Sequence, residues 1–322
     1  MQDNDKTIVV DVDAQRLSSV KAAAARSQNN SEYHSTDYSD LNKLLQDDLK
    51  VGDVVGGKYR ILSELQNNDG RAVYIVHPLD DFAQRFVIKI VKATMQSTAR
   101  KRFLREAKLH SAITHENIVK LVDFWGDSSR EYIVLEYIDG SSLKACCEDF
   151  SFDEAAALIV AYEISRALKY VWDNFKLIHR DIKPENIMIN SSNYIKLLDF
   201  GISKSKSAAN ETYLTMDNTI LGTLGYMSPE QFTNSKNVSI QSDMFSLGAT
   251  LCYLLTGKVP FTGEDLAAVY KATCEQTPPD LSSVEPALSQ NFINFINSIM
   301  QKDPAARPAS WDEVITMLSA MM

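Results

Sequence analysis

Two short segments of the sequence hold residue types suited to phosphate chemistry. Residues 179–186 read His-Arg-Asp-Ile-Lys-Pro-Glu-Asn, and Asp199 opens an Asp-Phe-Gly tripeptide thirteen residues after Asn186. Asp181 could orient a hydroxyl and accept its proton, and Lys183 could point the same way toward a transferring phosphate. Asn186 and Asp199 offer hard oxygen ligands, which Mg²⁺ prefers. Such a set could perform phosphoryl transfer, which depends on positioning and charge stabilisation.

Strand patterns dominate the part of the chain before these motifs. Branched and aromatic residues alternate with polar ones in short runs, which predicts β-strands at 59–65, 71–77, 86–91 and 132–137. Residues 68–70 read Asn-Asp-Gly, a turn signal that favours a hairpin between the first two strands. Helical spacing at 99–112 interrupts the series. This half of the chain therefore predicts an antiparallel sheet with one helix.

Helical patterns dominate the second half. Ser-Phe-Asp-Glu at 151–154 reads as a capping box that opens a helix reaching about Asn174. Residues 244–255 are apolar on nearly every side, which predicts a helix buried at the centre of its lobe. Within it, Gly248 and Ala249 are small enough for close packing.

Together these patterns predict an α+β fold with two lobes. We expect a small antiparallel sheet lobe at 57–138 and a larger, mostly helical lobe at 139–320. Residues 1–50 contain scattered Ser, Asn, Gln and Asp with little periodicity, and we predict that they are a mostly disordered tail.

The composition is that of an ordinary globular protein. The 322 residues are 45% hydrophobic and 23% charged, and the formal net charge is −9. That charge argues against a nucleic-acid surface, which needs clustered Lys and Arg. The four cysteines show neither metal-binding spacing nor the density of a disulfide scaffold, and no apolar run approaches the length that spans a bilayer. We therefore expect a cytoplasmic protein that binds neither nucleic acid nor membrane.

The motifs together resemble those of eukaryotic-type protein kinases, most closely the bacterial-like serine/threonine branch, over roughly residues 57–320. In that family, the lysine of a Val-Ala-Ile-Lys strand binds the α and β phosphates of ATP and pairs with a glutamate on a helix. Val-Ile-Lys at 87–89 and Arg-Glu-Ala at 105–107 match, which implies these roles for Lys89 and Glu106. The resemblance also implies ATP and Mg²⁺ as cofactors.

Other positions match the same family. By resemblance, Leu135 is the gatekeeper beside the adenine, and Glu136 to Ile138 form the hinge that contacts the nucleotide. His179 is implied to support the loop that carries Asp181 rather than to act as an acid or base.

Later motifs imply architectural roles. Ser-Pro-Glu at 228–230 resembles the Ala-Pro-Glu motif of the family, and Asp-Pro-Ala-Ala-Arg-Pro at 303–308 resembles its late arginine segment. The resemblance implies a buried ion pair between Glu230 and Arg307. Asp243 matches the residue that starts the central helix and braces the catalytic loop.

One motif of the family is degenerate. The phosphate loop reads Gly-x-Gly-x-x-Gly-x-Val, and aligning Val73 with its end places Gln66, Asn68 and Arg71 at the glycine positions. Either the hairpin tightens around residues 69–70 so that side chains contact phosphate, or nucleotide affinity is poor. The otherwise complete set favours the first interpretation and an active enzyme. A pseudokinase that binds nucleotide or a partner is the alternative.

The resemblance also indicates the acceptor. Lys183 in Asp-x-Lys-Pro-Glu-Asn is typical of serine/threonine kinases, and Thr223 matches the family threonine that bridges the catalytic Asp and Lys. We therefore expect protein substrates phosphorylated on Ser or Thr, including the chain itself. A small-molecule phosphotransferase is less favoured, because residues 222–230 match the segment that forms a docking ledge for a polypeptide; we call this segment the ledge.

Arg180 precedes the proposed catalytic aspartate. In the family, such an arginine can pair with a phosphorylated residue in the loop that corresponds here to residues 202–221. Thr215 and Thr219 are the preferred candidates by their spacing from the ledge.

Overall fold

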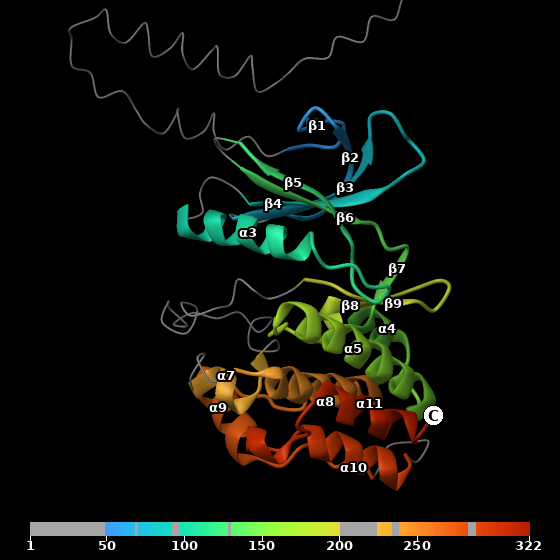
Figure 1. The fold of residues 1–322 in the computed structure, drawn as a ribbon, viewed down its shortest axis with the longest axis vertical. Helices are drawn as coiled ribbons and strands as arrows, with labels where there is room; N and C mark the ends of the chain where they lie inside the picture. Colours follow the sequence, from blue (N-terminus) through green and yellow to red (C-terminus); the bar gives the residue numbers. More distant parts are fainter. Residues whose placement is uncertain are drawn as a thin grey trace, which may run out of the picture.

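An antiparallel sheet and a group of helices lie one above the other along the long axis of the molecule (Figure 1). The computed structural model describes residues 49–67, 70–91, 97–127, 130–199, 224–233, 238–282 and 288–322. Nearly all of the predicted tail at 1–50 and the whole loop at 202–221 lie outside these residues, so their predictions are untested.

The upper sheet confirms the strand predictions. Its six strands follow the order β1-β2-β3-β4-β6-β5, and every neighbouring pair is antiparallel. Alternation sets its core: Tyr74 and Val76 on β3 and Ile88 and Ile90 on β4 are buried. The strands are β1 (Val54–Val55), β2 (Tyr59–Asn67), β3 (Arg71–Pro78), β4 (Phe86–Val91), β5 (Leu121–Gly126) and β6 (Glu131–Glu136).

Two elements of the sheet lie outside the ranges expected from the sequence. β1 precedes residue 57, the predicted start of this lobe, and β5 was not predicted as a strand. The predicted helix is present as α3 (Ser97–His110), which packs against β5 and β6. His110 at its end is buried, with Nε2 2.7 Å from the Val119 carbonyl oxygen. This contact anchors the end of α3 to the chain that leads into β5.

A second, three-stranded sheet lies between the upper sheet and the helices (Figure 1). It contains β7 (Gly140–Ser142), β8 (Ile187–Asn190) and β9 (Ile195–Leu197), joined in antiparallel pairs. The short turn η1 (Pro184–Asn186) leads directly into β8, and β9 ends two residues before Asp199. The small sheet therefore carries both motifs at its ends.

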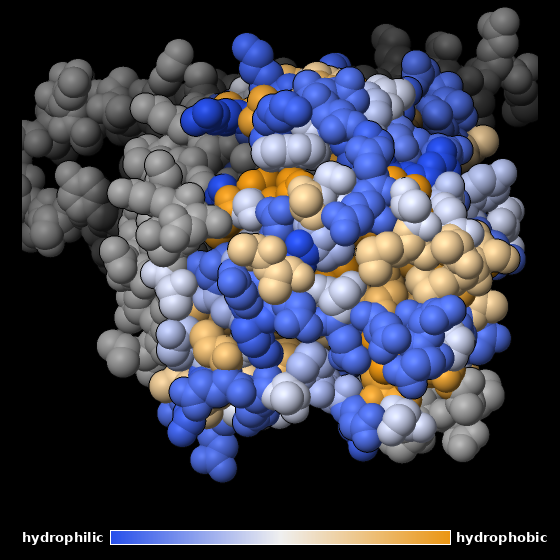
Figure 2. Space-filling view, turned by 60° about the horizontal axis from the view of Figure 1, so that its bottom comes forward, coloured by the Kyte–Doolittle hydropathy of each residue, from blue (hydrophilic) through white to orange (hydrophobic). Residues whose placement is uncertain are grey.

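Helices form the lower part of the molecule. They are α4 (Leu143–Asp149), α5 (Glu154–Phe175), α7 (Pro229–Thr233), α8 (Ile240–Thr256), α9 (Leu266–Glu275), α10 (Gln290–Ile299) and α11 (Trp311–Ser319), with the turn η3 (Pro304–Ala306). On the face shown in Figure 2, apolar side chains are interrupted by polar ones. Among the described helices, none combines the length and the apolar character needed to cross a lipid bilayer.

The cap of α5 corrects one sequence prediction. Asp153, not Ser151, is the N-cap, and its carboxylate accepts a hydrogen bond from the backbone N–H of Ala156 at 2.8 Å. Phe152 explains the choice, because it is buried and its backbone N–H donates to the Leu254 carbonyl at 3.0 Å. That contact holds the chain extended until Asp153, so the helix begins at Glu154.

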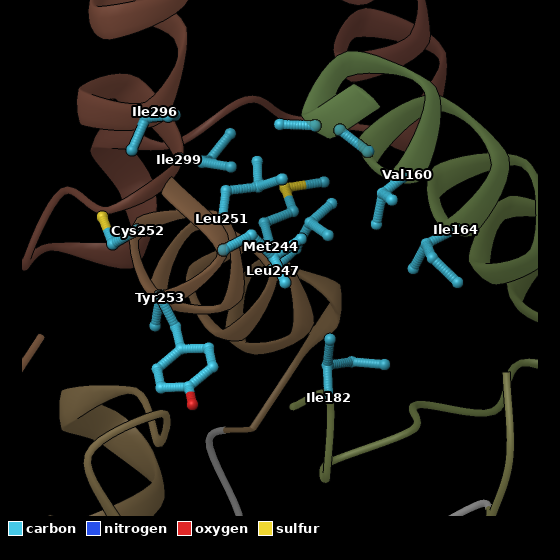
Figure 3. Close-up of a cluster of buried hydrophobic side chains, with 14 of the residues drawn as sticks. Val160, Ile164, Ile182, Met244, Leu247, Leu251, Cys252, Tyr253, Ile296 and Ile299 are labelled. Atoms are coloured by element: carbon cyan, nitrogen blue, oxygen red, sulfur yellow. The ribbon is translucent and has the colours of Figure 1, made fainter. Parts of the chain in front are cut away.

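Helix α8 is the buried centre that its sequence predicted. Met244, Leu247 and Leu251 face Val160 and Ile164 of α5 within one apolar cluster (Figure 3). Residues from α10 close the other side of this cluster. Nearly every residue of α8 is buried, which is why its sequence lacks a polar face.

Gly248 permits the close approach of α8 to the C-terminal end of α10, and its replacement tests this packing. A Cβ atom at Gly248 would lie 2.4 Å from Met300 Cγ and 3.0 Å from Ile299 Cγ1. We expect Gly248→Val to lower the free energy of unfolding by about 1–3 kcal/mol through overpacking. Urea denaturation measures this, with Ala155→Val on the exposed side of α5 as the control. Equal losses in both variants would contradict close packing at Gly248.

Candidate active site

The 179–186 segment brings three of the predicted site residues together. Asn186 Nδ2 donates to the Asp181 carboxylate at 2.9 Å and to the Asp181 backbone carbonyl at 2.8 Å. Lys183 Nζ lies 3.6 Å from Asp181 Oδ2. Pro184 fits the first position of the turn η1, since its missing N–H needs no partner there. The turn thus gathers a carboxylate, an ammonium group and an amide on one loop.

Asp199 meets a residue from the upper sheet. Lys89, on β4, forms an ion pair with Asp199, although 110 residues separate the two in sequence. Burial of the Asp199 carboxyl raises its pKa, but the charge and hydrogen bond of Lys89, together with His179, lower it by more, so the pKa of Asp199 lies below its ordinary value. The Asp199 carboxylate is therefore ionised at neutral pH, as a cation ligand must be.

Asn186 and Asp199 are held close together by the backbone. The N–H of Leu198, the residue before Asp199, donates to the Asn186 carbonyl at 2.8 Å. Among the described residues, no group of three or more His, Cys, Asp or Glu is placed to hold a metal ion. An asparagine and one aspartate suit Mg²⁺ bound with a nucleotide, because such an ion takes its other ligands from phosphate and water. The donor set therefore fits the implied metal.

Asp243 supports this loop from below, as the resemblance implied. It lies in the first turn of α8 and is buried, and its two carboxylate oxygens accept the backbone N–H groups of His179 and Arg180, each at 2.7 Å. Burial raises the pKa of Asp243 to about 7. His179 is also buried, with Nε2 2.8 Å from the Leu198 carbonyl oxygen. The imidazole thus links the loop to the segment before Asp199, which matches its predicted supporting role.

The predicted hinge contains an ion pair that no sequence motif indicates. Glu136 Oε1 accepts from Lys196 Nζ at 2.6 Å and from the Lys120 backbone N–H at 2.8 Å. Lys196 lies on β9, so the end of β6 is tied to the strand that leads to Asp199. Leu135 and Ile138 beside it are buried. Charge opposition alone could not have identified the pair, because 60 residues separate the partners.

The predicted pair of Glu230 and Arg307 is confirmed. Arg307 Nη1 lies 2.7 Å from Glu230 Oε1, and Nη2 lies 3.1 Å from Oε2. Ser242 Oγ donates to the same carboxylate at 2.6 Å. The Arg307 side chain has no exposed surface and that of Glu230 has 9%. This buried bidentate pair fixes the end of the ledge to the segment before α11.

Among the remaining predicted positions, some lie in the described part of the chain and others lie outside it. Glu106 lies on α3, where its pairing with Lys89 stays a prediction. Gln66 is exposed near the end of β2, and Arg71 is exposed at the start of β3. Strand β2 has register shifts on the way to this hairpin, including one just before Gln66. Asn68 and Thr223 lie outside the described residues, so the phosphate loop stays untested.

Comparison with known proteins agrees with this geometry. The protein kinase domain family matches residues 72–318. The chain is 34% identical over 275 residues to the probable serine/threonine-protein kinase PknB of Lactococcus lactis, covering 83% of this chain and 42% of that protein. It is 32% identical over 262 residues to the serine/threonine-protein kinase PrkC of Bacillus subtilis, covering 80% and 40%. The chain thus spans about two fifths of the length of these relatives.

A solved structure supports the fold. The crystal structure of the Mycobacterium tuberculosis PknI kinase domain superposes with a TM-score of 0.65 at 22% identity, covering 85% of this chain and all of that domain. The α+β fold with a sheet lobe and a helical lobe, predicted from sequence, is thereby confirmed. The chain belongs to the protein kinase family, and within it to the branch that contains the bacterial serine/threonine kinases.

Proposed function

We propose that this chain is a protein serine/threonine kinase that transfers the γ-phosphate of ATP to Ser and Thr hydroxyls of proteins. The observation that carries the proposal is the meeting of Lys89, from the upper sheet, with Asp199, beside the loop of Asp181 and Asn186. These contacts bring an ammonium group, a candidate metal ligand and a candidate base close together. Membership of the family supplies the reaction class.

Binding of the nucleotide is assigned to residues of both lobes. Lys89 would bind the α and β phosphates, with Glu106 orienting it from α3. Glu136 and Ile138 would contact the adenine through backbone groups, because the Glu136 carboxylate is already engaged by Lys196 and Lys120. Asn186 and Asp199 would hold Mg²⁺, which when bound neutralises charge on the phosphates.

Transfer itself is assigned to the loop. Asp181 would orient the acceptor hydroxyl and take its proton, and its hydrogen bond from Asn186 fixes the carboxylate for that task. Lys183, 3.6 Å from the same carboxylate, would stabilise charge on the phosphate that moves. The ledge at 222–230 would place a polypeptide acceptor, with Glu230 buried beneath it in the pair with Arg307, and such a segment disfavours a small-molecule substrate. Thr215 and Thr219 stay proposed sites of control by phosphorylation.

Transfer in vitro tests the proposal against the pseudokinase alternative. The purified chain, mixed with labelled ATP, Mg²⁺ and a generic protein substrate, is expected to produce phosphoserine or phosphothreonine, detected by mass spectrometry. Chelation of the metal should abolish the product. Binding of ATP without any transfer, to itself or to a substrate, would instead favour a nucleotide-binding module whose phosphate loop has lost its glycines.

A further inference from the structure

The backbone of Arg180, the residue immediately before Asp181, has an unusual conformation. Arg180 has φ of 67°, in the left-handed region that non-glycine residues rarely adopt. Such a conformation costs energy and persists only where surrounding contacts determine it. The carbonyl of Arg180 and the nitrogen of Asp181 form one peptide unit. The orientation of this unit therefore sets the direction in which the Asp181 side chain leaves the backbone.

Three backbone N–H groups at and beside Arg180 donate to side chains of the loop or of α8. Asp243 accepts the N–H of Arg180, as well as that of His179, at 2.7 Å. His179 Nδ1 accepts the N–H of Asp181 at 3.3 Å. These contacts hold backbone N–H groups of the loop. The carbonyl oxygen of Arg180 is not among their partners, so another residue must hold it.

Gln231 fixes that carbonyl. Its Nε2 donates to the Arg180 oxygen at 3.1 Å, although the two residues are 51 positions apart. The other end of the same amide, Oε1, accepts from Ser228 twice, from the backbone N–H at 2.9 Å and from Oγ at 3.1 Å. Ser228 has no exposed surface. One side-chain amide therefore joins the ledge to the peptide unit that orients Asp181.

We propose that Gln231 is a positioning residue that couples the ledge to Asp181, so that the acceptor and the base keep one relative placement. The inference rests on the proposed kinase function. Helix α7 keeps a second anchor when the amide is lost, because the neighbouring Glu230 is fixed by Arg307 and Ser242. Loss of the amide should therefore disturb the rate of transfer more than the stability of the fold.

Two substitutions separate the two ends of the amide. Gln231→Glu keeps an oxygen that accepts from Ser228, but it places a second oxygen in front of the Arg180 carbonyl. It therefore removes only the hydrogen bond to Arg180. Gln231→Met has a similar length and removes both. Gln241→Met is the matched control, because Gln241 Nε2 also donates to backbone carbonyls, those of Pro308 and Ala309 at 3.4 Å, and its other side-chain contact is with Ser239 rather than with the loop.

Kinetics give the first readout. We expect both Gln231 variants to lower kcat for a peptide substrate by about tenfold or more, with KM for ATP within twofold of the wild type. Gln241→Met should keep kcat within twofold and should show a melting temperature similar to that of Gln231→Glu, which keeps the acceptor for Ser228. A normal kcat in Gln231→Glu, or an equal loss in Gln241→Met, would overturn the coupling to Asp181.

Hydrogen–deuterium exchange gives a readout that needs no activity. In both Gln231 variants, a peptide spanning residues 177–186 should exchange about tenfold faster than in the wild type, and in Gln241→Met it should not. Unchanged exchange in the Gln231 variants overturns the inference. If the wild type transfers no phosphate, the kinase proposal fails, and this comparison still decides whether Gln231 holds the loop.

Discussion

Asp181→Asn is expected to lower the rate of phosphoryl transfer by about 10²- to 10⁴-fold. The substitution removes the group proposed to accept the proton of the hydroxyl and preserves the size of the side chain. It also removes the negative charge that lies 3.6 Å from Lys183 Nζ. Because Lys89, Asn186 and Asp199 remain, ATP should still bind, so the loss should fall on kcat rather than on KM for ATP.

The measurement pairs initial rates of peptide phosphorylation with ATP binding by calorimetry. Asp312→Asn is the matched control, because Asp312 is a mostly exposed aspartate that also contacts a lysine, Lys169 of α5, at 3.2 Å. This control should keep the rate within twofold. A wild-type rate in Asp181→Asn would show that another group accepts the proton. Loss of ATP binding in that variant would show that Asp181 is needed for the nucleotide site.

The parts of the fold that could be predicted are those whose pattern of apolar and polar residues is visible among neighbouring positions in the sequence. On β4, buried Ile88 and Ile90 alternate with the less buried Val87 and Lys89, and that period of two identifies the strand. Helix α8 lacks a polar face because it is enclosed on all sides. The order and spacing of the motifs predicted the family and, through it, the pair of Glu230 and Arg307.

The missed features depend on contacts between distant parts of the chain. Gln231 reads as one more polar residue on a short helix, and only the folded structure places its amide against Arg180. Likewise, Ser151 and Asp153 are both good N-caps, and the contact of Phe152 with α8 decides between them. The weak pattern of β5 gave no strand signal, and its pairing with β6 supplies the missing stabilisation.

Arg307→Met and Glu230→Gln are each expected to lower the free energy of unfolding by about 3–5 kcal/mol. Either change leaves the other partner buried without its counter-charge: the Arg307 side chain has no exposed surface and that of Glu230 has 9%. Urea denaturation of each variant measures the loss. A loss below about 1 kcal/mol, typical of surface pairs, would show that water reaches the site.

The double variant Glu230→Gln, Arg307→Met should lose much less stability than the sum of the two single losses, because it leaves no unpaired charge.

Acid should remove the stability that this ion pair contributes in the wild type, and it should have no such effect in the double variant, which lacks the pair. Burial raises the pKa of Glu230, but the hydrogen bonds and charge of Arg307, with Ser242, lower it by more, so the pKa lies below its ordinary value. The folded state therefore binds fewer protons than the unfolded state, and the stability that the pair contributes is present above about pH 4.3 and is lost as the pH falls through the folded pKa. Subtracting the unfolding curve of the double variant from that of the wild type isolates this loss, and a difference that stays constant from pH 7 down to pH 3 would mean that Glu230 is not held ionised by Arg307.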